Sequence, residues 1–188
     1  MSLDVSFTLN EHDLDHFRGV MRSAQQRAEQ VSEEEIVGEA RAVLDKVDEE
    51  KAPHFVLERL AKLRTMVAML EDEEWPLEGQ ERSDVVSALS YFYQPEDIID
   101  DSTPVLGLID DAIMIELVVR ELKHEFDAYE DFCEFRNTEE TLRGKDISRE
   151  DWLDAKRREL FSRMRERMNR RRQGSRGVGR LTRFSFLG

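Results

Sequence analysis

Hydrophobic residues recur every three or four positions along most of the chain, which is the spacing of amphipathic α-helices. This pattern predicts helices over residues 11–30, 33–47, 53–74, 80–93, 110–136 and 149–172. The longest apolar stripe lies in 110–136, so we expect one central helix there, followed by a linker over 137–146. The chain is therefore predicted to be all-α, a single helical bundle of about five to six helices.

Polar residues mark where several of these helices begin. Asn10 with Asp13, and Ser32 with Glu35, have the spacing of a capping box, in which each side chain bonds the other residue's backbone N–H. Pro53 suits the first turn of the third helix, where no backbone N–H is needed. That helix is expected to bury one apolar stripe, made of Phe55, Val56, Leu60, Leu63, Val67 and Leu70.

Both ends of the chain have a different pattern. Residues 3–9 alternate between apolar and polar side chains, which indicates a short N-terminal extended arm or strand. Residues 173–179 are rich in glycine and are expected to be unpacked, and residues 181–187 alternate again. Phe184 and Phe186 are apolar anchors that a solvated tail does not need, so pairing with the N-terminal arm is one interpretation of this end.

Charge divides the chain into two parts. The net charge is −14, but the segment from Lys156 to the end holds 12 Lys and Arg against 2 acidic residues, a net +10. Residues 1–155 hold 16 Lys and Arg against 40 acidic residues, a net −24. We therefore expect an acidic helical body over residues 1–140 and a basic C-terminal helix with a flexible tail over 141–188. The body would repel nucleic acids and anionic membranes, whereas the basic end would attract them.

Several features together predict a cytoplasmic protein without a transmembrane segment. Cys133 is the single cysteine, so no internal disulfide can form, and its place in an apolar stripe indicates a buried, unreactive thiol. The first residues lack the basic and apolar regions of a signal peptide. No apolar run approaches the roughly 20 residues of a membrane-spanning helix.

Residues 88–112 interrupt the helical pattern. They contain two prolines, one glycine and five aspartates, with apolar residues threaded between them. A solvated loop does not need those apolar residues, so we interpret the stretch as a structured corner between the fourth helix and the central helix.

The residues of this corner resemble the YkvA-like family, a small helical domain of unknown function. The matching positions are Tyr91, Pro95, Asp97, Ile98, Ile99, Asp101, Pro104, Gly107, Asp110 and Asp111. The resemblance covers residues 85–125, and the flanking chain is similar to longer bacterial proteins that carry the domain. Asp100, Ser102 and Leu108 depart from the family pattern, which usually has a proline, a bulky apolar residue and an aromatic residue there. The family implies no established activity, substrate or cofactor.

The aspartates of the corner have two interpretations. Carboxylates that converge from a turn are the ligands that Mg²⁺ or Ca²⁺ takes, and the candidates are Asp97, Asp101, Asp110 and Asp111. In the other interpretation Asp97 closes an Asx-turn, Asp101 accepts backbone N–H groups, and Asp110 caps the central helix. We favour capping and predict no cofactor, so a metal-dependent enzyme that uses these aspartates is the alternative.

Two histidine spacings have also been associated with metal binding. Glu121 and His124 have the Glu-x-x-His spacing of di-iron bundles, and His12 and His16 lie one helical turn apart. Each pair borders an apolar stripe or lies in an acidic first turn, so we interpret both as surface groups. No glycine-rich phosphate loop follows a strand, and no spacing suggests a nucleophile with its base. Catalysis by a known motif is therefore unsupported.

Arginines are concentrated near the C-terminus and wrap around the last predicted helix. They include Arg163, Arg167, Arg170, Arg171, Arg172, Arg176 and Arg180. They would bind an anionic partner such as nucleic acid or a lipid surface, or they would fold back on the acidic body.

The sequence as a whole favours a non-enzymatic protein-interaction or adaptor module with an unknown protein partner. The two alternatives are the metal-dependent enzyme and the binding of nucleic acid or an anionic surface through the arginine-rich end. The sequence indicates no oligomeric state.

Overall fold

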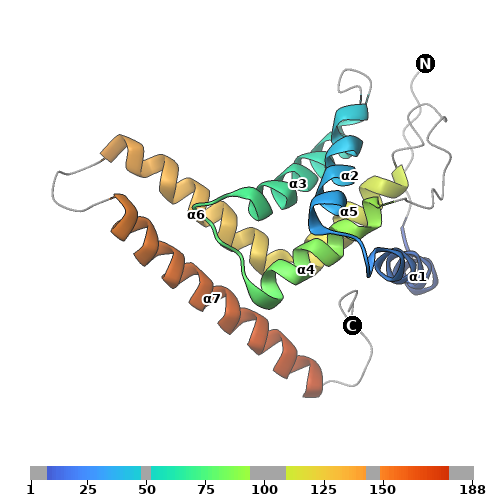
Figure 1. Ribbon diagram of the computed structural model, residues 1–188. Helices are drawn as coiled ribbons and strands as arrows, with labels where there is room; N and C mark the ends of the chain where they lie inside the picture. Colours follow the sequence, from blue (N-terminus) through green and yellow to red (C-terminus); the bar gives the residue numbers. More distant parts are fainter. Residues whose placement is uncertain (1–7, 48–51, 94–108, 143–148, 178–188) are drawn as a thin grey trace.

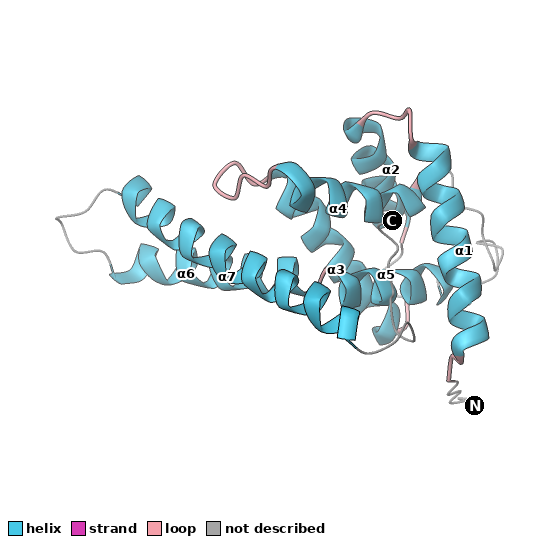
Figure 2. Ribbon diagram, turned by 90° about the horizontal axis from the view of Figure 1, so that it is seen from below, coloured by secondary structure: helices cyan, strands magenta, loops and turns pink. Residues whose placement is uncertain are grey.

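The computed structural model describes residues 8–47, 52–93, 109–142 and 149–177, and these residues form an all-α bundle (Figures 1 and 2). Within them are seven α-helices, one short 3-10 helix and no strand. The α-helices are α1 (Glu11–Ala28), α2 (Glu33–Lys46), α3 (His54–Glu71), α4 (Gly79–Leu89), α5 (Ile109–Glu121), α6 (Lys123–Leu142) and α7 (Arg149–Gly177), and the 3-10 helix is η1 (Ser90–Phe92). None of the described helices has both the length and the apolar character that crossing a membrane requires.

The two predicted capping boxes are confirmed. The Asn10 side chain accepts hydrogen bonds from the backbone N–H groups of His12 and Asp13, at 2.9 and 3.3 Å. The Asp13 carboxylate in turn accepts from the Asn10 N–H at 2.9 Å. Ser32 and Glu35 bond each other in the same way at the start of α2. Polar groups at these helix starts are therefore satisfied locally, as the spacing of the residues predicted.

The prediction of one central helix over 110–136 is wrong, because the chain divides there into α5 and α6. Leu122 lies between the two helices, and Figure 1 shows the chain changing direction at this point. The sequence has neither proline nor glycine from 109 to 142, so no backbone-specific residue causes the bend. It accompanies a change of partner instead, since α5 packs chiefly on α3 and α6 packs chiefly on α7. This division raises the helix count above the expected five to six.

Two further boundaries differ from the predictions. The helix α6 continues to Leu142, so the linker expected from residue 137 begins later. The helix α7 continues to Gly177, so residues 173–177 are helical although their glycines predicted an unpacked segment. The N-terminal arm over 3–7 and the tail from residue 178 lie outside the described residues.

The core prediction for α3 is correct for most of its apolar stripe and wrong at Phe55. Val56, Leu60, Leu63, Val67 and Leu70 are buried as expected. The Phe55 ring is 40 % exposed, and the Arg59 guanidinium lies over it, 4.3 Å from the ring centroid. Met66 and Met69 are buried although they lie off the predicted stripe, because α3 packs against four other helices, α2, α4, α5 and α6.

Trp75, in the connection between α3 and α4, is the packing centre that joins α7 to the body. Its side chain is 0 % exposed. The ring stacks on Phe161 of α7 at 4.4 Å between centroids, and it contacts Phe132 and Tyr129 of α6 at 5.0 and 5.8 Å. Three segments far apart in the sequence therefore meet at one aromatic side chain.

Hydrogen bonds around the same connection support this contact. Asp72 accepts from Arg136 Nη1 at 2.8 Å and from the Tyr129 hydroxyl at 3.1 Å. Arg157 of α7 donates to the backbone carbonyl of Glu74 at 2.8 Å. The connection that carries Trp75 is thereby held against both α6 and α7.

We predict that Trp75→Ala lowers the free energy of unfolding by about 3 to 5 kcal/mol, because it leaves a large cavity between α6 and α7. Urea denaturation followed by circular dichroism measures this change. The matched control is Phe55→Ala, which removes an exposed ring and is expected to cost under about 1 kcal/mol. Equal losses for the two variants would contradict the central position given to Trp75.

Candidate functional site

The corner that carries the family motif lies mostly outside the described residues. Pro95, Asp97, Ile98, Ile99, Asp101, Pro104 and Gly107 all lie there. Of the remaining motif residues, Tyr91 is buried in η1, and its ring packs edge-on against Phe92 at 5.0 Å. Asp110 and Asp111 occupy the first turn of α5, and Asp110 is buried. Carboxylates at this position are stabilised by the positive end of the helix dipole.

The metal interpretation of the four aspartates stays a prediction. In the part of the chain that the structure describes, no three His, Cys, Asp or Glu side chains are arranged to hold a metal ion. Asp97 and Asp101 are not in that part, so the complete set with Asp110 and Asp111 is not tested.

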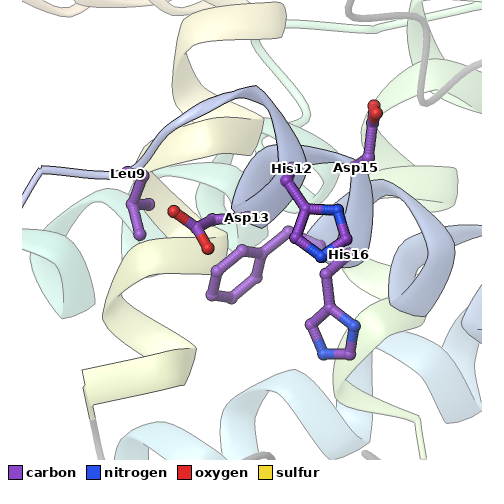
Figure 3. Close-up of a pocket in the computed structure, with 6 residues that line it drawn as sticks. Leu9, His12, Asp13, Asp15 and His16 are labelled. Atoms are coloured by element: carbon purple, nitrogen blue, oxygen red, sulfur yellow. The ribbon is translucent and has the colours of Figure 1, made fainter.

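The histidine pair of α1 lines an open pocket of about 510 Å³ (Figure 3). His12 and His16 project on the same side of the helix, and Asp15 points away from them. Asp13 also lines the pocket, but its carboxylate is already bonded to the Asn10 N–H in the capping box. Both histidines are exposed, so this surface offers no buried polar group that a ligand would satisfy.

A second group of polar side chains, three of them buried, lies where α4, α5 and α6 meet under α7. Glu81 and Asp84 come from α4, Glu121 ends α5, and Glu125 belongs to the first turn of α6. Glu81 is 9 %, Asp84 4 % and Glu125 3 % exposed. We call these four residues the carboxylate cluster.

Sequence reasoning missed most of this cluster, although a signal was present. Glu125 lies at the helical spacing of Leu122 and Tyr129, and Asp84 lies at the spacing of Ala88, all of them buried. An acidic residue within an apolar stripe predicts a buried carboxylate. Of the four residues, only Glu121 is a candidate from the sequence pattern, through its spacing to His124. These two residues instead have different surroundings, since Glu121 bonds α7 and His124 Nδ1 is buried without a described hydrogen-bond partner.

Arginines from the C-terminal part of α7 cover the carboxylate cluster. Arg165 Nε donates to Glu81 Oε1 at 2.7 Å. Arg171 donates to both the backbone carbonyl and the carboxylate of Glu121, at 2.9 and 3.1 Å. Arg167 Nη1 lies 3.8 Å from Asp127 Oδ2 on α6. Part of the basic end therefore folds back on the acidic body, along the length of α6 (Figure 1).

The environment of the cluster changes how its groups titrate. Burial raises the pKa of Glu125 to about 7, and the nearby charges of Asp84 and Glu121 act in the same direction, while Arg171 opposes them. Burial also raises the pKa of Asp84, against a hydrogen bond from Gln80 Nε2 at 2.6 Å. The cluster thus contains a carboxyl group that changes its charge near neutral pH.

Burial changes the pKa of the adjacent His124 in the opposite direction from that of the carboxyl groups. It lowers the pKa of His124, and the charges of Arg171 and Arg167 lower it further, whereas Asp127 opposes them. The imidazole is therefore held in its neutral form beside the arginines that cover the cluster.

The cluster is better suited to holding α7 than to catalysis. Three of its carboxylates are at most 9 % exposed, and arginine side chains lie over it. The pocket described above is elsewhere, at the start of α1. A general acid or base must come within hydrogen-bond reach of a substrate, and in the described structure arginines of α7 already occupy Glu81 and Glu121.

The arginines predicted for an anionic partner fall into two sets. Arg171 is bonded to Glu121, and Arg167 faces Asp127. Arg163 and Arg170 are exposed and pair with Glu159 and Glu166 one turn earlier on α7 itself. Arg172 is also exposed. The side chain of Arg176 and the whole of Arg180 lie outside the described residues, and binding of a partner by these arginines stays a prediction.

We predict that Glu125→Gln stabilises the protein at pH 8. The pKa of about 7 in the folded state exceeds the unfolded value of 4.5. The folded state therefore binds the extra proton between pH 4.5 and 7, and the stability from this group is lost as the pH rises through that range. Removing the charge should raise the free energy of unfolding by about 1 to 3 kcal/mol at pH 8 and by less at pH 5.

Urea denaturation at the two pH values measures this difference. Glu134→Gln is the matched control, because Glu134 lies on the same helix and is exposed. Its effect should be small and the same at both pH values. A Glu125→Gln variant that is no more stable than the natural protein at pH 8 would contradict the buried, charged state assigned to Glu125.

Comparisons with known proteins identify the segment around the corner. Residues 85–117, which run from α4 into α5, match the family described as "Protein of unknown function (DUF1232)". Neither the curated proteins nor the solved structures gave a match. The matched segment contains the Tyr91 to Asp111 pattern on which the resemblance was based. The chain therefore carries a DUF1232 domain over residues 85–117, the YkvA-like domain of unknown function that its motif predicted.

Proposed function

We propose that the protein is a non-enzymatic interaction module that binds an acidic segment of a partner protein through the exposed face of α7. The observation that supports this most directly is the spacing of Arg163, Arg167 and Arg170. They lie at i, i+4 and i+7, which places them on one side of a helix, and all three are exposed. Guanidinium groups in such a row can form paired hydrogen bonds with carboxylates.

The buried side of α7, next to this row, fixes the first half of the helix in place. Leu153, Leu160 and Met164 are buried against the body. Trp152 stacks on Phe135 of α6 at 3.4 Å between ring centroids, and Phe161 stacks on Trp75. A binding helix that is already ordered loses less conformational freedom when a partner binds.

The charge around α7 favours a short acidic protein segment over a nucleic acid. Residues 1–155 carry a net −24, which would repel a long polyanion that extends past the helix. Glu159 and Glu166 also interrupt the exposed arginine row. A short acidic segment can pair with individual arginines and avoid both sources of repulsion.

The test uses a fluorescent deca-glutamate peptide and the full-length protein. We expect Arg163→Gln/Arg170→Gln to weaken peptide binding by about five- to thirtyfold, since each exposed charge pair contributes roughly 0.5 to 1 kcal/mol. Fluorescence anisotropy titrations measure the affinity, and circular dichroism confirms the fold.

The matched control is Arg22→Gln/Arg120→Gln, which removes the same charge from exposed arginines on α1 and α5. This control should bind the peptide like the natural protein. Equal losses for the two double variants would contradict a binding face on α7. Tighter binding of a nucleic-acid duplex than of the peptide would favour the nucleic-acid alternative.

A further inference from the structure

The two halves of α7 are attached to the body by different forces. Up to Met164 the contacts are mainly apolar, with buried Leu153, Leu160 and Met164 and the stacked rings of Trp152 and Phe161. In residues 165–173, all of which the structure describes, Met168 is half-buried and the other side chains are exposed. We call residues 165–173 the strap.

Charge holds the strap. Its described polar contacts with other helices are those of Arg165 with Glu81, Arg171 with Glu121, and Arg167 with Asp127, and Met168 adds one partly buried apolar side chain. Such contacts are weakened by salt and by competing anions far more than apolar contacts are. The strap can therefore open while the first half of α7 stays in place.

The arginines of the strap can pair either with an acidic partner or with carboxylates of the body. Arg167 and Arg170 of the exposed row lie within residues 165–173, between Arg165 and Arg171. Arg165 and Arg171 are held by Glu81 and Glu121, so an acidic partner that extends from this row to them must displace these two carboxylates. Two anionic groups that need the same cation exclude each other, so the pairing of Arg165 and Arg171 within the chain lowers the apparent affinity of the partner.

Opening the strap also exposes a surface that the closed form keeps covered. Asp84 and Glu125 are buried beneath it, and the charges of Arg172 and Arg171 favour their ionised forms. Without the strap, Glu81 and Glu121 would lose the arginines that pair with them, and the cluster would be open to water on that side. The described structure is the closed form, in which this acidic surface is covered.

We propose that Glu81 and Glu121 are built-in competitors that hold the strap closed and inhibit the binding of the acidic partner. This inference rests on the proposed function, because it concerns the regulation of the same α7 surface. The competitor is part of the chain, so its effective concentration is high and a free acidic segment must displace it.

The test compares the affinity of the deca-glutamate peptide for Glu81→Gln/Glu121→Gln and for the natural full-length protein. Removing both internal competitors should tighten binding by about tenfold. The matched control is Glu34→Gln/Glu39→Gln, which removes the same charge from two exposed residues of α2. If the control binds the peptide more tightly by the same factor, the change in net charge alone explains the effect, and the proposal is overturned.

Limited trypsin digestion measures the opening of the strap without any peptide. Cleavage after Arg167, Arg170 and Arg171, identified by mass spectrometry, should be several-fold faster in Glu81→Gln/Glu121→Gln than in the control. Arg165→Gln, which breaks the contact with Glu81 from the other side, should accelerate cleavage as well. Unchanged cleavage in both variants would overturn the strap, even if one of them were poorly folded.

The outcomes separate this inference from the proposed function. Binding of the peptide with equal affinity by the natural protein and by Glu81→Gln/Glu121→Gln overturns the inhibition and leaves the proposed function standing. Failure of both proteins to bind overturns the proposed function and, with it, the competition.

Discussion

The burial of Trp75 is the contact on which the position of α7 depends. This residue lies between α3 and α4, and its ring is enclosed by Phe132 and Tyr129 of α6 and by Phe161 of α7. The helix α7 is otherwise strongly polar and has too few apolar residues to bind the body along its whole length. This aromatic cluster, together with buried Leu153, Leu160 and Met164, fixes its first half, and every interaction proposed for its second half follows from that placement.

Attraction between the acidic body and the basic C-terminal end adds to this apolar packing. A body with a net −24 and an end with a net +10 attract each other, and α7 brings them together in register. The arginines of the strap cover buried carboxylates that would otherwise repel one another. Because the pKa of Glu125 is raised to about 7, this arrangement also carries a charge cost at neutral pH that pairing offsets only in part. An anionic partner can compete for the arginines of a helix that is held over this cluster partly by charge.

Local signals in the sequence predicted the helices well. The capping boxes at Asn10 and Ser32 are formed, and the DUF1232 segment was found from its motif. Features that depend on contacts between distant segments were not predictable in this way. A continuous apolar stripe concealed the break at Leu122, because helical periodicity does not show which neighbour each turn will meet.

The candidate site shows the same limit. The arginines of the last helix and the acidic body were both evident, but their pairing joins residues 84 and 50 positions apart, as in Arg165 with Glu81 and Arg171 with Glu121. Burial of Glu125 was signalled by its place in an apolar stripe, yet only the packing of α4 and α7 shows what surrounds it. Sequence patterns predict which face of a helix is buried, but the neighbouring element that this face contacts depends on the whole fold.

Apolar packing holds one half of α7, and charge holds the other. Amide hydrogen exchange of the full-length protein at about 0.05 M and about 1 M NaCl tests it most directly, because salt at the higher concentration screens charge beyond roughly 3 Å. We predict that exchange in residues 165–173 becomes at least several-fold faster at high salt, while exchange in residues 152–164 stays the same. Exchange that changes equally in both halves, or in neither, would contradict this division of forces along α7.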